Sequence, residues 1–214
     1  MLELGLKTLI GYLLGSVVGA LVVGRFRGVD IRTLGSGNPG GTNALRTQGF
    51  AFAAATVVID VAKGWLAAAW LPGLEIPGIA TDRGVDRDWL AACCAAGAVA
   101  GHVWPLWHDF RGGKGGATLA GTLLALAPVL FLIALTAWFV VAMLTGFVWL
   151  ATTAAAYAVA IAAVSQAPAS VALYAIAMAA LVAWAHRGNF ARMRARKEPR
   201  LQKLWLLRPR ERGR

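Results

Sequence analysis

The chain has 214 residues, of which 58% are hydrophobic and only 14% are charged. A soluble domain carries about 25% charged residues, so this composition excludes an ordinary soluble globular protein. The net charge of +11 is uneven, because eleven of the 21 Lys and Arg residues follow His186. Basic residues beside apolar blocks are typical of membrane proteins, and the aromatic interleaving of single-strand binders is missing. We therefore expect no nucleic-acid partner.

Four apolar blocks, at residues 4–23, 50–71, 89–104 and 117–184, contain few or no charges. A membrane helix needs roughly 20 apolar residues, so each of the first three blocks predicts one span. The first lacks the small-residue cleavage site of a signal peptide, and we interpret it as a retained span. The last block predicts four short or tilted helices with breaks near Pro128, Thr145-Gly146 and residues 165–169. The sequence thus predicts an all-α integral membrane protein with seven transmembrane helices.

The connecting segments predict how this single membrane-embedded domain, residues 1–214, is oriented. The basic segments are loops at about 24–49, 105–116 and 186–200 and a tail at 187–214. The segment 72–88 is mildly acidic and fits the opposite side of the membrane. Because basic loops face the cytoplasm, we expect the N-terminus outside and the C-terminus in the cytoplasm.

The first basic loop contains GSGNPG at residues 35–40, which matches the dinucleotide-binding pattern G-x-G-x-x-G. That pattern binds NAD only within a strand–helix–strand unit, and this loop connects two membrane helices, so we exclude NAD. Glycine-rich turns expose N–H groups that bind anions, and arginine can grip a phosphate with two hydrogen bonds. A merely flexible loop is the alternative. The candidate phosphate-binding residues are Ser36, Asn38, Thr42, Asn43 and Arg46.

The second basic loop contains five residues, Gly-Gly-Lys-Gly-Gly, immediately before an apolar helix. Free N–H groups at a helix N-terminus and one lysine favour phosphate binding. The loop lacks the Walker pattern, since Gly115 follows Lys114, so ATP hydrolysis has no support. The candidate binding residues are Gly112, Gly113, Lys114, Gly115 and Thr118.

The third basic segment begins with His186, and Asn189 follows three positions later. This spacing places both on one face of a helix, so both can reach one pocket. Histidine is a candidate base or hydrogen-bond donor, although a histidine at a membrane surface is often a bland interfacial residue. With two anion-binding loops on the same face, the pattern favours a functional role.

Charged residues also lie within the apolar blocks. Asp60 and Lys63 are three residues apart and can neutralise each other. Charges inside a membrane suggest a functional site by default, but a purely structural pair is an equal alternative. Together with His102, they are candidates for residues that support the substrate-binding residues without contacting substrate themselves. We expect no metal, because Cys93 and Cys94 lack zinc spacing and no carboxylates cluster together.

The three basic segments together resemble the bacterial acyl-phosphate:glycerol-3-phosphate 1-acyltransferase family, also called the PlsY family. The resemblance rests on GSGNPGGTNALR, GHVWPLWHDFRGGKGGAT and HRGNFARMRARKEP, in this order, and it covers essentially the whole chain. It implies a seven-helix membrane enzyme that moves a fatty acyl group from acyl phosphate to the 1-hydroxyl of sn-glycerol 3-phosphate. The products are lysophosphatidic acid and inorganic phosphate, made in phospholipid biosynthesis.

The resemblance also implies roles for individual residues. Ser36 and Arg46 match essential residues of the first motif, and His186 and Asn189 match the activity residues of the third. The loop from Gly112 to Gly115 matches the glycerol 3-phosphate site. Glu198 matches an acidic residue with a structural role. The chain departs from the family pattern at Gly41, Arg111, Gly116 and Arg196, of which the last lies two positions before Glu198.

The implied partners are glycerol 3-phosphate, acyl phosphate and membrane lipid, and the enzyme that supplies acyl phosphate is a further candidate. The implied location is the bacterial cytoplasmic (inner) membrane, with the site facing the cytoplasm. Acyl phosphate is already activated, so we expect no cofactor, no metal and no covalent intermediate. The base is either His186 or a phosphate oxygen of the substrate.

Two other functions compete with this interpretation. An organic-phosphate transporter would place its site near the bilayer midplane, whereas these motifs cluster at one surface. An acyltransferase that uses acyl-CoA would carry H-x-x-x-x-D, but positions 107, 113 and 191 are Trp, Gly and Ala.

Overall fold

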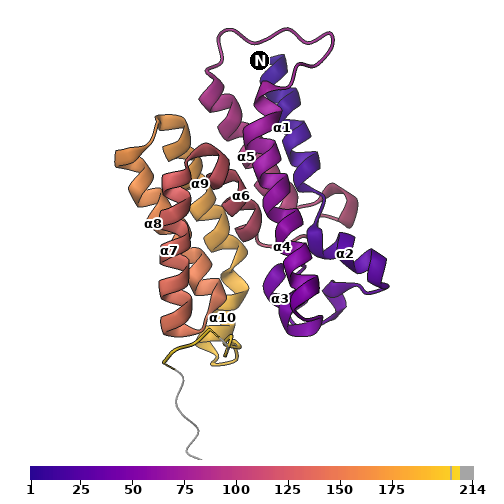
Figure 1. Cartoon of the computed structure of the whole chain (residues 1–214), viewed down its shortest axis with the longest axis vertical. Helices are drawn as coiled ribbons and strands as arrows, with labels where there is room; N and C mark the ends of the chain where they lie inside the picture. Colours follow the sequence, from indigo (N-terminus) through magenta and orange to yellow (C-terminus); the bar gives the residue numbers. More distant parts are fainter. Residues whose placement is uncertain (203, 208–214) are drawn as a thin grey trace, which may run out of the picture.

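The computed structural model describes residues 1–202 and 204–207, and these residues form helices and no strand (Figure 1). The ten α-helices are α1 Leu2–Gly15, α2 Gly19–Arg27, α3 Gly41–Thr47, α4 Phe50–Trp65, α5 Arg87–Val103, α6 Gly116–Leu126, α7 Pro128–Thr145, α8 Val148–Gln166, α9 Ala169–Ala185 and α10 Arg187–Arg194. The all-helical prediction is confirmed, and helix ends fall at the predicted breaks near Pro128, Thr145 and residues 165–169. The predicted basic tail is only partly covered, because residues 203 and 208–214 lie outside the described residues.

Within residues 1–202 and 204–207, four helical segments are long and apolar enough to cross a membrane, namely Phe50–Gly73, Arg87–His108, Pro128–Thr145 and Val148–Gln166. The number rises to six if the pairs α1–α2 and α9–α10, bent by 40° and 47°, each count as one span. The remaining apolar helix, α6, has 11 residues and is shorter than the hydrocarbon core requires. The count of seven spans and the topology therefore stay predictions.

The first predicted span is broken rather than continuous. α1 ends at Gly15 and α2 begins at Gly19, within the block that the sequence predicted as one helix. Two polar side chains of α4, those of Asp60 and Lys63, contact the backbone at this break, and these contacts satisfy groups that a continuous helix would pair internally.

The helices form two groups with α6 between them (Figure 1). Helices α7, α8 and α9 lie on one side, and α1, α4 and α5 lie on the other. α4 and α6 approach closely, since a side chain at Gly64 would collide with the backbone of Thr118 and one at Gly121 with the backbone of Val61. Small residues permit such backbone approach between membrane helices.

The main apolar core lies where α5, α6, α8 and α9 meet, and it is rich in alanine. Ala95, Val99, Ala163 and Val182 are each fully buried there. Many large apolar side chains of α7 are exposed instead, among them Val129 and Leu132. An exposed apolar helix face fits a lipid environment, where burial against protein is not required.

A group of charged side chains lies at the end of the bundle that holds the N-terminus, and we call it the N-terminal ion cluster (Glu3, Lys7, Asp82 and Arg87). The Nζ atom of Lys7 lies 2.7 Å from Oε1 of Glu3, and Nη2 of Arg87 lies 3.0 Å from the same oxygen. The backbone N–H of Asp82 donates to Oε2 of Glu3 at 2.8 Å. Only 4% of Glu3 and 2% of Lys7 are exposed, so these charges are paired inside the protein.

Candidate active site

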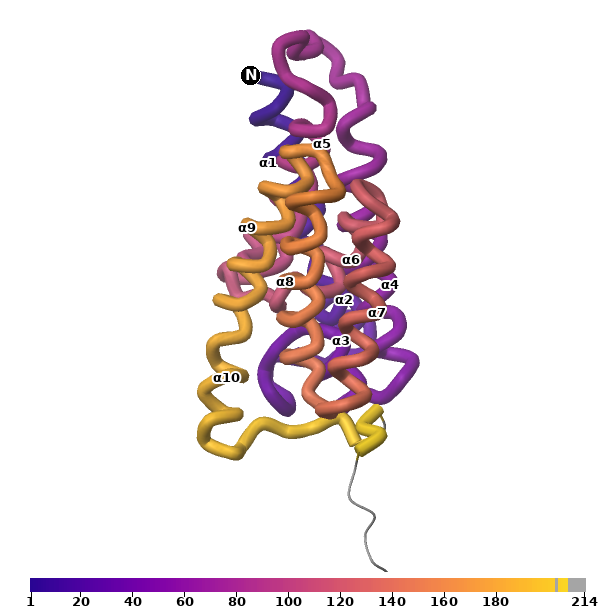
Figure 2. Tube along the Cα trace, turned by 90° about the vertical axis from the view of Figure 1, so that its left-hand side faces the viewer, coloured from indigo at the N-terminus to yellow at the C-terminus, as the bar shows by residue number. Residues whose placement is uncertain are grey.

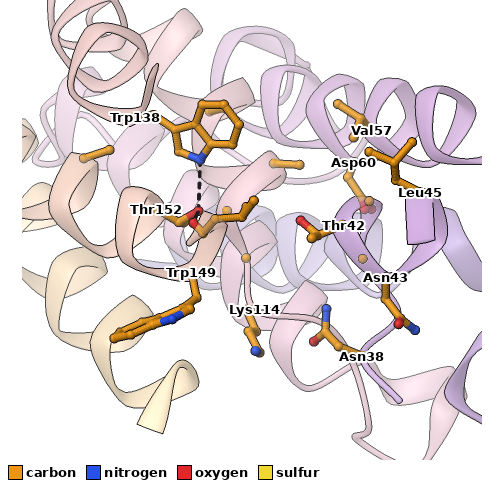
Figure 3. A pocket seen from close by; sticks show the side chains of 18 of the residues that line it. Asn38, Thr42, Asn43, Leu45, Val57, Asp60, Lys114, Trp138, Trp149 and Thr152 are labelled. Atoms are coloured by element: carbon orange, nitrogen blue, oxygen red, sulfur yellow. Dashed lines mark hydrogen bonds between the residues drawn. The ribbon is translucent and has the colours of Figure 1, made fainter. Parts of the chain in front are cut away.

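A pocket of about 620 Å³ lies between the two helix groups, at the end of the bundle away from the N-terminus. Its polar end is lined by the loops around Ser36 and Lys114 and by the segment from His186 to Pro199. Its apolar walls come from α4, α6, α7 and α8 (Figure 3). Val57 and Leu135 line the pocket and are also 41% and 40% exposed, so the apolar walls continue onto the lipid-facing surface.

The first loop is held in shape by Asn43, which lies in α3 and is buried. Its Oδ1 accepts a hydrogen bond from the N–H of Ser36 at 2.9 Å, and its Nδ2 donates to the carbonyl of Leu34 at 2.9 Å. The side chain of Asn43 is therefore engaged in folding the loop that presents Ser36. Arg46, one helical turn later, donates to the carbonyl of Pro199 at 3.1 Å. This bond joins the first motif to the third.

The second loop turns back onto the end of α5 before α6 begins. The N–H of Gly112 donates to the carbonyl of Val103 at 3.2 Å, and that of Gly113 donates to the carbonyl of His102 at 3.0 Å. These two N–H groups are therefore used within the protein. Gly115, with φ of 80°, takes a left-handed conformation that glycine favours and starts α6. The first turn of a helix has unpaired N–H groups, and here that turn adjoins Lys114.

The third segment presents His186 and Asn189 to the same pocket, as their spacing predicts. Nδ1 of His186 lies 2.8 Å from the carbonyl oxygen of Val182. A carbonyl only accepts, so Nδ1 carries the proton and Nε2 of the neutral imidazole keeps a lone pair. His186 is 6% exposed, and this nitrogen is a candidate proton acceptor.

Glu198 holds the third segment together through hydrogen bonds to two of its side chains. Its Oε1 accepts from Nδ2 of Asn189 at 2.6 Å, and its Oε2 accepts from Nε of Arg192 at 2.7 Å. The side-chain oxygen of Asn189 in turn accepts from Nζ of Lys114. A chain of contacts thus links the acidic residue to the lysine of the second loop.

Positive charge exceeds negative charge at the polar end of the pocket. Arg46, Lys114, Arg192 and Glu198 all line it. Burial, followed by the charge of Arg192, lowers the pKa of Lys114 to about 8, and burial also lowers the pKa of Arg46. Burial disfavours a charge that lacks a partner. An anionic ligand would supply that partner.

Asp60 and His102 also line the pocket, whereas Lys63 does not. Asp60 and Lys63 form an ion pair with 2.9 Å between Oδ1 and Nζ. Within the part of the chain that the structure describes, no three His, Cys, Asp or Glu side chains gather as metal ligands would.

Twelve of the predicted site residues line this one pocket: Ser36, Asn38, Thr42, Asn43, Arg46, Asp60, His102, Lys114, Gly115, His186, Asn189 and Glu198. Four others, Lys63, Gly112, Gly113 and Thr118, lie outside its lining. Their roles, and those of the lining residues, stay predictions.

The sequence did not identify the apolar half of the pocket. Trp138 of α7 lies across from α8, and its Nε1 donates to Oγ1 of Thr152 at 3.1 Å (Figure 3). Phe131 and Leu135 of α7 line the same wall. Because α7 is apolar on every face, no periodic pattern distinguishes the residues that face the pocket from those that face lipid.

Comparison with known proteins gives consistent matches. The family model described as glycerol-3-phosphate acyltransferase matches residues 6–196. The glycerol-3-phosphate acyltransferase of Rhodospirillum rubrum is 44% identical over 204 residues, covering 94% of this chain and 92% of that protein. The one from Rubrobacter xylanophilus is 39% identical over 194 residues, covering 88% of this chain and 90% of that protein.

Two solved structures also match. The crystal structure of PlsY (YgiH), an integral membrane glycerol 3-phosphate acyltransferase, in its glycerol 3-phosphate form has a TM-score of 0.80 and 29% identity, covering 92% of this chain and 94% of that one. Its lysophosphatidic acid form has a TM-score of 0.79 with the same identity and coverage.

Proposed function

Because the chain belongs to the glycerol-3-phosphate acyltransferase family, we propose that it transfers a fatty acyl group from acyl phosphate to the 1-hydroxyl of sn-glycerol 3-phosphate. The products are lysophosphatidic acid and inorganic phosphate. The observation that carries the proposal is the pocket itself, in which a cationic end continues into apolar walls that reach the lipid-facing surface. One cavity can thus receive a soluble phosphate and a membrane-dissolved chain.

The polar end suits two phosphorylated substrates. Lys114 and Arg46 supply charge-assisted hydrogen bonds, and the unpaired N–H groups at the start of α6 add neutral donors. Ser36 is presented at the same end by the loop that Asn43 holds. The solved relative in its glycerol 3-phosphate form supports this class of ligand.

The apolar walls suit the acyl chain. Val57 of α4 faces the pocket from one side, and Leu135 and Trp138 of α7 face it from the other. An acyl chain that enters between these helices from the membrane exchanges one apolar environment for another, so the walls can hold it without exposing it to water. The reacting carbonyl would then lie near Lys114, where the polar and apolar parts of the pocket meet.

The chemistry is a direct transfer. The 1-hydroxyl oxygen attacks the acyl carbon, the bond from that carbon to the phosphate oxygen breaks, and phosphate leaves with the bonding electrons. The hydroxyl proton goes to Nε2 of His186 or to an oxygen of the substrate phosphate. Acyl phosphate has a good leaving group, so the reaction needs no covalent acyl-enzyme, metal or cofactor. Lys114 neutralises charge that develops on the phosphate.

We also infer the setting of the reaction. The chain acts as one membrane domain, residues 1–214, with seven apolar segments in the bacterial inner membrane. The basic loops at 24–49, 105–116 and 186–200 face the cytoplasm, because positive charge collects on that side. Soluble glycerol 3-phosphate then enters from the cytoplasm, and the acyl donor enters from the membrane. The enzyme that supplies acyl phosphate is a candidate partner.

Acyl transfer by the purified protein in detergent or lipid tests this proposal. Labelled glycerol 3-phosphate is supplied with palmitoyl phosphate or with palmitoyl-CoA, in the presence of EDTA. We expect labelled lysophosphatidate from palmitoyl phosphate alone. Product from palmitoyl-CoA alone, or a requirement for added metal, would contradict the proposed donor or mechanism.

A further inference from the structure

A buried group of three polar side chains connects the break in the first span to the loop that carries Lys114. Asp60 and Lys63 belong to α4, and His102 belongs to α5, near its end. They are 1%, 5% and 3% exposed. Such groups are costly to bury, so each needs partners.

Lys63 satisfies one side of the break. Its Nζ donates to the carbonyl of Gly15, the last residue of α1, at 2.8 Å and to that of Val17, within the break, at 2.7 Å. Its Nζ also lies 2.9 Å from Nδ1 of His102, which is the partner for its third hydrogen, and 2.9 Å from Oδ1 of Asp60, with which it forms an ion pair. Without the imidazole, Lys63 would still pair its charge with Asp60 and donate to two carbonyl oxygens.

Asp60 satisfies the other side of the break. Its Oδ1 accepts from the N–H of Gly19, at the start of α2, at 3.0 Å. The same oxygen lies 3.3 Å from Nδ1 of His102. The carboxylate thus fixes the start of α2, which leads to the first motif loop, and it lies beside one edge of the imidazole.

The opposite edge of the imidazole meets the second motif loop. A side chain at Gly113 would collide with Nε2 of His102, and the two next nearest atoms belong to the same ring. The N–H of Gly113 also donates to the carbonyl of His102. Gly113 has no positive φ, so backbone conformation does not require a glycine there. The space that the His102 ring occupies does require a glycine at this position.

We propose that Asp60, Lys63 and His102 form a positioning unit that sets the place of Lys114 through contact of the His102 ring with Gly113, and that Gly113 is glycine to admit this ring. The inference rests on the proposed function, since Lys114 is there a phosphate-binding residue. In this account, neither His102 nor the N–H of Gly113 binds substrate. The unit also joins the two motif loops, because Asp60 holds the start of α2.

A double-mutant cycle between His102→Ala and Gly113→Ala tests the contact. H102A leaves Lys63 paired with Asp60 and bonded to two carbonyl oxygens, so no charge is left unpaired. G113A should raise KM for glycerol 3-phosphate about tenfold or more, through overpacking against the ring, with a smaller change in kcat. H102A should raise this KM severalfold. The KM of the double variant should not exceed that of H102A, because the ring with which the new side chain would collide is absent.

Gly112→Ala is the matched control in the same loop. A side chain at Gly112 would collide with the backbone carbonyl of His102 and with Pro105, not with the imidazole. The change in KM that G112A causes should therefore be the same whether position 102 is His or Ala. His102→Asn, which keeps a polar group near Asp60 but lacks the far edge of the ring, should also relieve G113A if H102A does not fold.

Each outcome decides the matter. If removal of the His102 ring lowers the KM of G113A but not that of G112A, the proposal is supported. An equal rise in KM from G113A with His or Ala at position 102 would overturn the proposal. It would indicate instead that Gly113 is glycine because substrate lies against it. If the unmodified chain makes no lysophosphatidate from either donor, the proposed function fails. The cycle is then measured by the midpoint of thermal unfolding. If the effects of H102A and G113A on this midpoint are not additive, whereas those of H102A and G112A are, the contact is still supported. Additive effects of H102A and G113A would overturn it.

Discussion

The N-terminus lies at one end of the bundle, and α3 and α10 lie at the other (Figures 1 and 2). The N-terminal ion cluster and the polar end of the pocket both hold charged side chains, but they differ in how those charges are balanced. Glu3 accepts from both Lys7 and Arg87, so the cluster neutralises itself. In the pocket, Lys114 contacts the amide of Asn189 and Arg46 contacts a carbonyl, which are neutral partners. A self-neutralised cluster stabilises a fold, whereas cations with neutral partners are prepared for an anion.

This difference predicts that changes in the pocket alter catalysis and changes in the ion cluster alter stability. His186→Ala should have the largest effect. If His186 is the base, kcat should fall by roughly 10²–10⁴, as general base catalysis contributes that much. The same assay on His108→Ala, which lies outside the pocket lining, should give nearly normal kcat. A loss below tenfold in H186A would instead make the substrate phosphate the base.

Glu3→Gln tests the other half of the comparison. Removing one partner of a buried ion pair costs about 3–5 kcal/mol, because the charge of Lys7 stays buried. The midpoint of thermal unfolding should fall, while kcat per folded molecule should not change. The exposed Glu75→Gln is the control and should leave the midpoint in place. A loss of kcat without a loss of stability would place the ion cluster in the reaction.

Lys114→Met should weaken substrate binding by about 10- to 150-fold, the equivalent of about 1.5–3 kcal/mol for a charged hydrogen bond. KM for glycerol 3-phosphate and for acyl phosphate, measured separately, shows which phosphate the lysine holds. Lys197→Met changes an exposed lysine of the tail and should have little effect. Equal KM values in K114M and the unmodified chain would exclude a phosphate contact.

The smallest predicted effect is a dependence on pH. The pKa of Lys114 in the free protein is lowered to about 8, so the side chain is charged below pH 8 and loses its proton above it. KM for the phosphate that Lys114 holds should rise severalfold from pH 7 to pH 9. Lys114→Arg stays charged over this range and should abolish the rise. An unchanged pH profile in K114R would assign the effect to another group.

The sequence predicted the helical class and the polar residues of the pocket more successfully than their individual contacts. Breaks at Pro128 and Gly146 were predictable because proline and glycine have local conformational preferences. Asn43 was predicted to bind substrate, yet its side chain is engaged by the backbone of its own loop. Composition and spacing identify a polar residue but not which partner satisfies it.

Two further features depended on tertiary contacts. The break between Gly15 and Gly19 is stabilised by side chains more than 40 positions away, so the local apolar pattern predicts a continuous helix. The N–H groups of Gly112 and Gly113, expected to be free, are used by the end of α5. In each case the distinguishing information is a hydrogen bond between residues nine or more positions apart, which the pattern of adjacent residues does not contain.

The most direct test of the central claim, that both phosphorylated substrates meet in one pocket and react directly, is a rapid-quench measurement of phosphate release from palmitoyl phosphate. Direct transfer predicts no burst without glycerol 3-phosphate, and one phosphate for each lysophosphatidate once it is added. A burst equal to the amount of enzyme without acceptor, together with acylated protein, would contradict it.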